Sequence, residues 1–213
     1  MQTSELIRRL SAEARPVQPG APLQRLASAL FAGMIVSFVV MWAWLGLRPD
    51  LTSAVWTAAY WIKFGYALLM SAAGLWLTDR VGRPGTLIRQ PSWLIAAVFL
   101  LIAAAAAIQL GEAPAFERHK LLMGSSANVC PWRIVALSLP IFVSVGFALR
   151  RLAPTRLILA GIAAGLLSGA AGAWIYAFHC DESAMPFVAI WYTLGMASVG
   201  GLGGVSGKWL LRW

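Results

Sequence analysis

The sequence predicts an all-α, polytopic integral membrane protein: a bundle of six transmembrane helices with both termini in the cytoplasm. Of its 213 residues, 60% are hydrophobic and 12% are charged, whereas soluble domains have about 45–50% and about 25%. The apolar residues fall in runs close to the ~20 that cross ~30 Å of hydrocarbon as a helix. The basic residues lie between these runs. The formal charge of +9 therefore does not indicate one basic face, and we expect no direct contact with nucleic acid.

Residues 1–23 form the first predicted unit, a cytoplasmic amphipathic helix followed by a proline-rich linker. No apolar core follows the first basic residues, so this region is not a secretory signal. The helix is predicted from Thr3 to Ala14, with Leu6, Ile7 and Leu10 on one face and Arg8 and Arg9 on another. Two uses fit this pattern equally well. The helix either rests on the membrane with its arginines on lipid phosphates or binds a partner protein.

Residues 24–213 form the second unit, the transmembrane domain. Six apolar segments are read as helices, because a helix satisfies its own backbone hydrogen bonds in lipid. Their approximate ranges are 26–47, 57–77, 91–110, 131–149, 157–178 and 187–211.

The basic residues give the predicted orientation, because Lys and Arg are retained on the cytoplasmic side of short loops. Twelve of the 17 flank one side of the spans and five flank the other, namely Arg48, Lys63, Arg118, Lys120 and Arg133. Both termini are therefore predicted to be cytoplasmic. For a bacterial inner membrane, the opposite side is the periplasm.

Glycines at spacing four mark the last two predicted helices. They are Gly161, Gly165 and Gly169 on the fifth, and Gly200 with Gly204 or Gly203 with Gly207 on the sixth. Small residues let helix backbones approach closely. We interpret the pattern as packing within one chain rather than as a dimer face, and the sequence does not specify the oligomeric state.

The chain has two cysteines, Cys130 and Cys180, and both are predicted on the periplasmic side. Thiols in that oxidising compartment pair, bind a metal or react with an oxidant. One interpretation is a constitutive disulfide between the outer ends of neighbouring helices. The other is a switchable redox or metal sensor with no constitutive cofactor, which takes up a heavy-metal ion transiently at Cys130 and Cys180.

Six further residues are candidates to assist the cysteines. His179, His119, Asp181 and Glu182 are candidate auxiliary metal ligands. Arg133 and Lys63 would favour a thiolate and so lower a thiol pKa. Simpler roles also fit, with His179 as a polar helix cap and Lys63 reaching toward lipid headgroups. No spacing matches a structural zinc motif.

The sequence gives little support to an enzyme, because it has no G-x-S-x-G elbow, no H-E-x-x-H and no phosphate-binding glycine loop. We therefore predict no catalytic residues. The alternative to a sensor is a small multi-pass transporter or membrane-assembly protein with a structural periplasmic disulfide.

Several short motifs together resemble one family, the NrsF-type negative regulators of sigma-F. The resemblance covers nearly the whole chain and is carried by Glu5-Leu6-Ile7 with Pro16-Val17, Gly46-Leu47-Arg48-Pro49-Asp50-Leu51, Cys130-Pro131-Trp132-Arg133, Leu152-Ala153-Pro154-Thr155, His179-Cys180 and Phe187-Val188-Ala189-Ile190-Trp191-Tyr192.

This resemblance implies a six-span anti-sigma factor of the bacterial inner membrane. Such a protein holds an extracytoplasmic-function sigma factor at the bilayer and releases it on envelope, heavy-metal or oxidant stress, and the matching functional positions are Cys130 and Cys180. The zinc-binding H-x-x-x-C-x-x-C pattern of many soluble anti-sigma domains is not in the sequence. Sigma binding is therefore expected from the cytoplasmic loops and from Leu6, Ile7, Arg8, Arg9 and Leu10.

Overall fold

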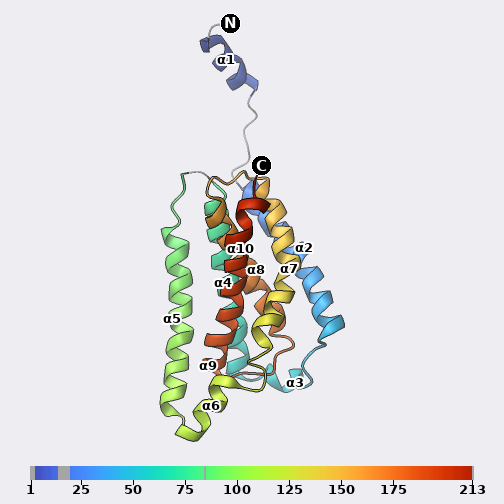
Figure 1. Ribbon diagram of the computed structural model, residues 1–213, viewed down its shortest axis with the longest axis vertical. Coiled ribbons are helices and arrows are strands. Elements are labelled where there is room, and N and C mark those ends of the chain that lie inside the picture. The colour runs from blue at the N-terminus through green and yellow to red at the C-terminus, as the bar shows by residue number, and fades with distance from the viewer. Residues whose placement is uncertain (1–2, 14–19, 84, 213) are drawn as a thin grey trace.

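A computed structural model of the chain describes residues 3–13, 20–83 and 85–212, apart from the side chains of Leu6, Arg9, Leu10 and Glu13. Within these residues the fold is all helical (Figure 1). Each predicted apolar segment corresponds to one long helix, and the last of them is composite. The helices are α2 (Ala21–Trp44), α4 (Ala58–Val81), α5 (Arg89–Glu112), α7 (Cys130–Arg150), α8 (Leu157–Tyr176) and the run α9 (Met185–Phe187), η1 (Val188–Tyr192) and α10 (Thr193–Leu210).

Five of these six helices are long and apolar enough to cross a membrane, within the described residues. They are α2, α5, α7, α8 and the composite helix Met185–Leu210. The second predicted span corresponds to α4, which does not belong to this group and which carries Lys63, Asp79 and Arg80. Large apolar side chains face outward from the bundle, as Leu100, Leu101 and Phe147 do. An apolar exterior of this kind is compatible with a surrounding bilayer.

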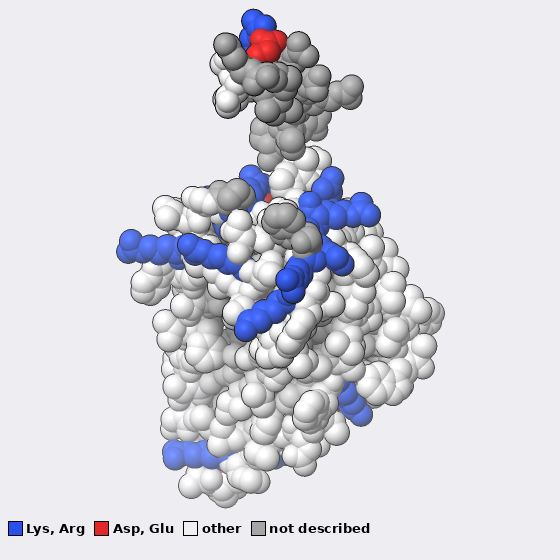
Figure 2. Space-filling view, turned by 45° about the horizontal axis from the view of Figure 1, so that its top comes forward, with Lys and Arg blue, Asp and Glu red and all other residues white. Residues whose placement is uncertain are grey.

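The two ends of the bundle differ in charge. The end from which α2 starts and at which α10 finishes is called here the terminal end, and the opposite end, with α3 (Leu51–Ala54), α6 (Ala115–Met123) and α9, is called the distal end (Figure 1). Lys and Arg gather around the terminal end (Figure 2). The helix ends there carry Arg25, Arg80, Arg83, Arg89, Arg150, Arg151, Arg156, Lys208 and Arg212. Within the described bundle, residues 20–83 and 85–212, the two groups of basic residues separated in the sequence thus lie at opposite ends.

Helix α8 forms the centre of the bundle, where it packs against α4, α7 and α10. Its glycines let α10 approach so closely that a Cβ on Gly161 would overlap the Gly203 carbonyl oxygen, and a Cβ on Gly165 would overlap that of Val199. This contact lies within one chain, as the glycine spacing predicted. Backbone proximity of this kind supplies the van der Waals contact that holds helices together in lipid.

Three local features differ from the predicted pattern. Two short helices, α3 and α6, lie in what the sequence indicated as polar loops. α6 follows Pro114 and ends before Gly124, whose φ of +50 places it in the left-handed region. Proline before a helix and glycine after it are common helix boundaries, and this signal was overlooked. The third feature is η1, a π-helical turn between α9 and α10.

The predicted amphipathic helix is present as α1 (Thr3–Glu13), and Figure 1 shows it set apart from the bundle. Its Ile7 side chain is 61% exposed, and Arg8 forms an ion pair with Glu5 at 2.6 Å. The predicted sigma-binding side chains of Leu6, Arg9 and Leu10 lie outside the described residues.

Candidate functional site

The candidate site is the segment Phe178–Glu182 at the distal end, together with the side chains that hold it. The segment begins where α8 ends, and the amides of His179 and Cys180 both donate to the Tyr176 carbonyl, at 2.9 and 3.0 Å. Cys180 is buried in this turn. The carbonyl oxygens of the segment are then free to accept hydrogen bonds from side chains on other elements.

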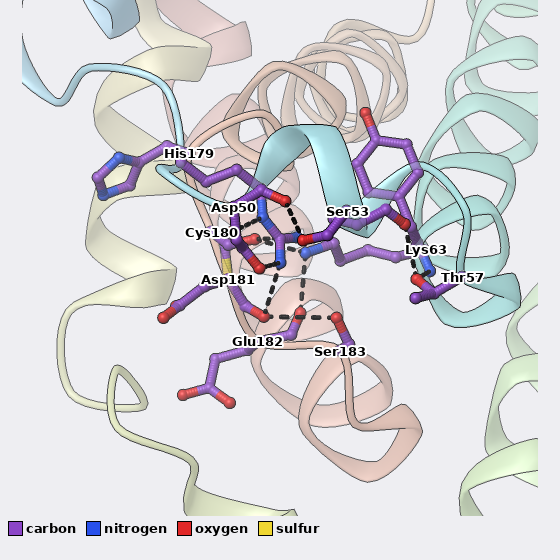
Figure 3. Close-up of polar contacts among 12 residues, drawn as sticks. Asp50, Ser53, Thr57, Lys63, His179, Cys180, Asp181, Glu182 and Ser183 are labelled. Carbon is purple, nitrogen blue, oxygen red and sulfur yellow. Dashed lines mark hydrogen bonds and ion pairs between the residues drawn. The ribbon is translucent and has the colours of Figure 1, made fainter.

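Lys63 on α4 is the first of these side chains, and it is wholly buried. Its Nζ donates to the carbonyl oxygens of Cys180 at 2.7 Å and Glu182 at 2.8 Å (Figure 3). The ammonium also lies 5.9 Å from the Tyr192 ring centroid. A buried charge needs such compensation, since burying it without partners costs several kcal/mol. Lys63 therefore does not reach toward headgroups but fixes two backbone positions around Asp181.

Arg48, which is 5% exposed, holds the same segment from the other side. Its backbone amide donates to the Phe178 carbonyl at 3.1 Å. Its guanidinium donates to the Cys180 carbonyl at 3.3 Å and the Asp181 carbonyl at 3.4 Å. Figure 3 shows the Lys63 side chain reaching the backbone of the same segment. Cys180 is thus the one residue whose carbonyl both Lys63 and Arg48 reach.

Asp50 orients Arg48 through two charge-assisted hydrogen bonds, from Nε and Nη2, each at 2.7 Å. The hydrogen bond from Arg48 holds the pKa of Asp50 below its ordinary value, and the same bond raises the pKa of Arg48. Bidentate pairing of this kind fixes the plane of the guanidinium. Asp50 therefore lets Arg48 keep its remaining donors aimed at the carbonyls of the segment.

The segment is also tied to the α2–α3 loop and to α7 through His179. The His179 Nδ1 lies 3.1 Å from the Gly46 carbonyl oxygen, which can only accept, so Nδ1 carries the hydrogen. Arg133 then donates to Nε2 at 3.3 Å. At the other end of the segment, a Glu182 carboxylate oxygen accepts from the Ser125 amide at 2.5 Å and hydroxyl at 2.8 Å.

Cys130 is the first residue of α7 and is fully buried. Both cysteines are free thiols. The two thiols are close enough to interact electrostatically, and the Lys63 ammonium is close enough to interact with both. The buried hydroxyl of Tyr192 on η1 is close enough to interact with both thiols as well. The fold thus brings together two cysteines that are fifty positions apart in the sequence.

The other predicted site residues divide into two groups. Arg133, His179 and Glu182 join the cluster through the hydrogen bonds above, but none of these bonds reaches a sulfur atom. The Asp181 carboxylate points away from Lys63 (Figure 3), and His119 is exposed on α6. Among the described residues, no group of three His, Cys, Asp or Glu side chains is placed to hold a metal ion.

Sequence reasoning missed the structural roles of Arg48, Asp50 and Ser125. From the sequence, Arg48 is predicted only as one of the five basic residues on the outer side. The Gly46–Leu51 motif was the available signal, because it places Arg48 two residues before Asp50.

Comparisons with known proteins give a consistent result. A family model described as "Negative regulator of sigma F" matches residues 10–213. The "Anti-sigma-F factor NrsF" of Caulobacter vibrioides (strain NA1000 / CB15N) is 40% identical over 215 residues, and the alignment covers all of both chains. The "Probable anti-sigma-F factor NrsF" of Azospira oryzae (strain ATCC BAA-33 / DSM 13638 / PS) is 38% identical over 216 residues, again covering both chains completely. No solved structure matches the chain.

Proposed function

This chain belongs to the NrsF family, the negative regulators of sigma F, and from this premise we propose that it is a membrane-bound anti-sigma factor for an extracytoplasmic-function sigma factor. Its family makes it a negative regulator of a sigma factor, which is a regulatory and not an enzymatic kind of protein. The match of the family model over residues 10–213 is the observation that carries the proposal.

The proposed location is a bacterial inner membrane, with several spans and with both termini in the cytoplasm. Five long apolar helices and an apolar exterior support insertion. The excess of Lys and Arg at the terminal end supports the orientation, because basic residues are retained on the cytoplasmic side. In this arrangement the distal end, with both cysteines, faces the periplasm.

The proposed sigma-binding surface consists of α1 and the short loops at the terminal end. An amphipathic helix presenting apolar side chains can fill a groove on a partner protein. Ile7, a large apolar residue on α1, is mostly exposed and so is available for such a contact.

Ile7→Asp is expected to weaken sigma binding at least tenfold, because it places a charge where an apolar groove would close over the helix, and tenfold is about 1.4 kcal/mol. Retention of the sigma factor on proteoliposomes measures the effect. Ala12→Asp is the matched control, since it adds the same charge to an exposed position about 140° away around the helix at 100° per residue. Equal retention by the parent and the Ile7 variant would exclude α1 from the binding surface.

We further propose that the distal end senses stress at Cys130 and Cys180. Oxidation to a disulfide joins the two sulfur atoms and passes two protons and two electrons to an oxidant, whereas a thiophilic cation displaces the thiol protons. Either change moves the Cys180 sulfur, and its backbone carbonyl is held by Lys63 and Arg48. The displacement would therefore break the hydrogen bonds that fix Phe178–Glu182. A coupling of about 1.4 kcal/mol is enough for a tenfold fall in sigma affinity.

Cys130→Ser and Cys180→Ser are expected to hold the sigma factor as the parent does. Under stress, their affinity for the sigma factor is expected to fall less than twofold. The affinity of the parent for the sigma factor is expected to fall at least tenfold on treatment with the thiol oxidant diamide or with Zn²⁺. Release is measured from proteoliposomes, and Ser183→Ala is the control within the same loop. If both serine variants respond like the parent, the thiols are not the sensor.

A further inference from the structure

The terminal end contains two adjoining cavities lined by arginines. One, of about 630 Å³, is bordered by Arg80, Arg89, Gln90 and Trp93. The other, of about 390 Å³, shares Arg80 and Arg89 and adds Arg83, Thr155 and Arg156. Thr86 borders both, and its hydroxyl donates to the carbonyl oxygens of Arg80 and Arg83, so it shapes the loop between α4 and α5. Four arginines thus border two cavities that share part of their lining.

Most of this positive charge is not neutralised by the protein. Asp79 is the only acidic residue at this end of the described bundle, and it is already paired with Arg83 at 2.7 Å. In the described structure no carboxylate pairs with Arg80, Arg89 or Arg156. Arg80 instead lies 6.0 Å from the Trp76 ring centroid. A cavity bordered by three unpaired arginines favours an anionic ligand with several acceptor oxygens.

An apolar groove begins about one helical turn further along α5. It has a volume of about 290 Å³ and is lined on α5 by Ser92, Ile95, Ala96 and Phe99. Its other wall comes from α4, α8 and α10, where it includes Met70, Leu166 and Met196. The arginine cavities and the groove together match an amphipathic molecule that has an anionic head and an apolar chain.

We propose that these cavities and the groove bind one anionic phospholipid, with its phosphate on Arg80, Arg89 and Arg156 and an acyl chain along α5. Basic pockets between helices at the cytoplasmic face are suited to such headgroups. The exposed Trp93 borders the cavity near the start of α5, and tryptophans favour the membrane interface near the ends of membrane-spanning helices. This inference rests on the proposed membrane location. It assigns these three arginines to the lipid and leaves Arg150 and Arg151 to the sigma-binding loops.

The test uses the full-length protein in detergent, with phosphatidylglycerol and phosphatidylcholine as probes in native mass spectrometry. The parent is expected to bind phosphatidylglycerol at least tenfold more tightly than phosphatidylcholine. In the triple variant Arg80→Gln, Arg89→Gln, Arg156→Gln, that preference is expected to be at least fivefold smaller than in the parent. The control triple Arg25→Gln, Arg150→Gln, Arg151→Gln removes the same charge from exposed positions of the same end and should change it less than twofold.

Three results would overturn the lipid site. They are no preference in the parent, equal losses in the two triples, and displacement of the lipid by millimolar inorganic phosphate, which would mean that the apolar chain contributes nothing. Sigma binding is measured on the same samples. A cavity triple that loses the sigma factor but keeps the lipid would assign the arginines to the protein partner. A parent that binds the lipid but no sigma factor would refute the proposed function while leaving this site intact.

Discussion

Replacing Gly161 or Gly203 with alanine is expected to prevent α8 and α10 from packing, and hence to lower the yield and melting temperature of the bundle sharply. A Cβ on either glycine would overlap a backbone carbonyl oxygen of the other helix. Since a backbone cannot rotate away as a flexible side chain can, the two helices must separate. Overpacking a core typically costs about 1–3 kcal/mol and sometimes more, and we expect about 3 kcal/mol or more here.

The chain provides a matched control on α10 itself. A Cβ on Gly201 meets no atom within 4 Å, so Gly201→Ala should leave the melting temperature unchanged or raise it, since alanine favours a helix over glycine by up to about 1 kcal/mol. Thermal unfolding in detergent, followed by circular dichroism, separates the two cases. If the Gly161→Ala and Gly201→Ala variants had the same melting temperature, the close approach of α8 and α10 would be refuted.

Replacing Lys63 with methionine is expected to produce a protein that releases the sigma factor without stress. The substitution keeps the length of the side chain but leaves the Glu182 carbonyl oxygen without its donor and the Cys180 carbonyl oxygen with Arg48 alone. An unsatisfied buried acceptor costs about 1–3 kcal/mol. The variant also loses a buried charge, which offsets part of that cost in overall stability. We therefore expect the segment Phe178–Glu182 to become less ordered while the melting temperature changes little. The affinity for the sigma factor is expected to be at least tenfold lower.

Sigma retention on proteoliposomes without any added oxidant or metal measures this effect, and hydrogen exchange at 178–182 reports the loosening directly. Lys120→Met is the control, because Lys120 is an exposed cation of α6 at the same end. Lys63→Arg keeps the charge and the donors and should restore part of the retention. Normal retention by Lys63→Met would show that the clamp on Cys180 is not needed for sigma binding.

The sequence predicted the features that depend on composition along the chain. It did not predict which groups of distant segments contact one another. Apolar runs located the long helices to within a few residues, and glycine spacing located the contact between α8 and α10. For Lys63, the sequence predicted a side chain that favours a thiolate or reaches toward lipid headgroups. The actual partners are backbone carbonyls, which every residue has and which no pattern can distinguish. Similarly, α6 is too short and too polar for apolar periodicity to reveal it.

The close packing of α8 against α10 makes the two helices one rigid unit. Helices whose backbones touch have no flexible layer of side chains between them, so they tilt as one body. α8 has 20 residues, and at 1.5 Å per residue it is about 30 Å long. It starts directly after Arg156, at the rim of the arginine cavities, and ends four residues before Cys180. If α8 tilts about its middle, a shift of about an ångström at the end near Cys180 moves the end near Arg156 by a similar amount in the opposite direction.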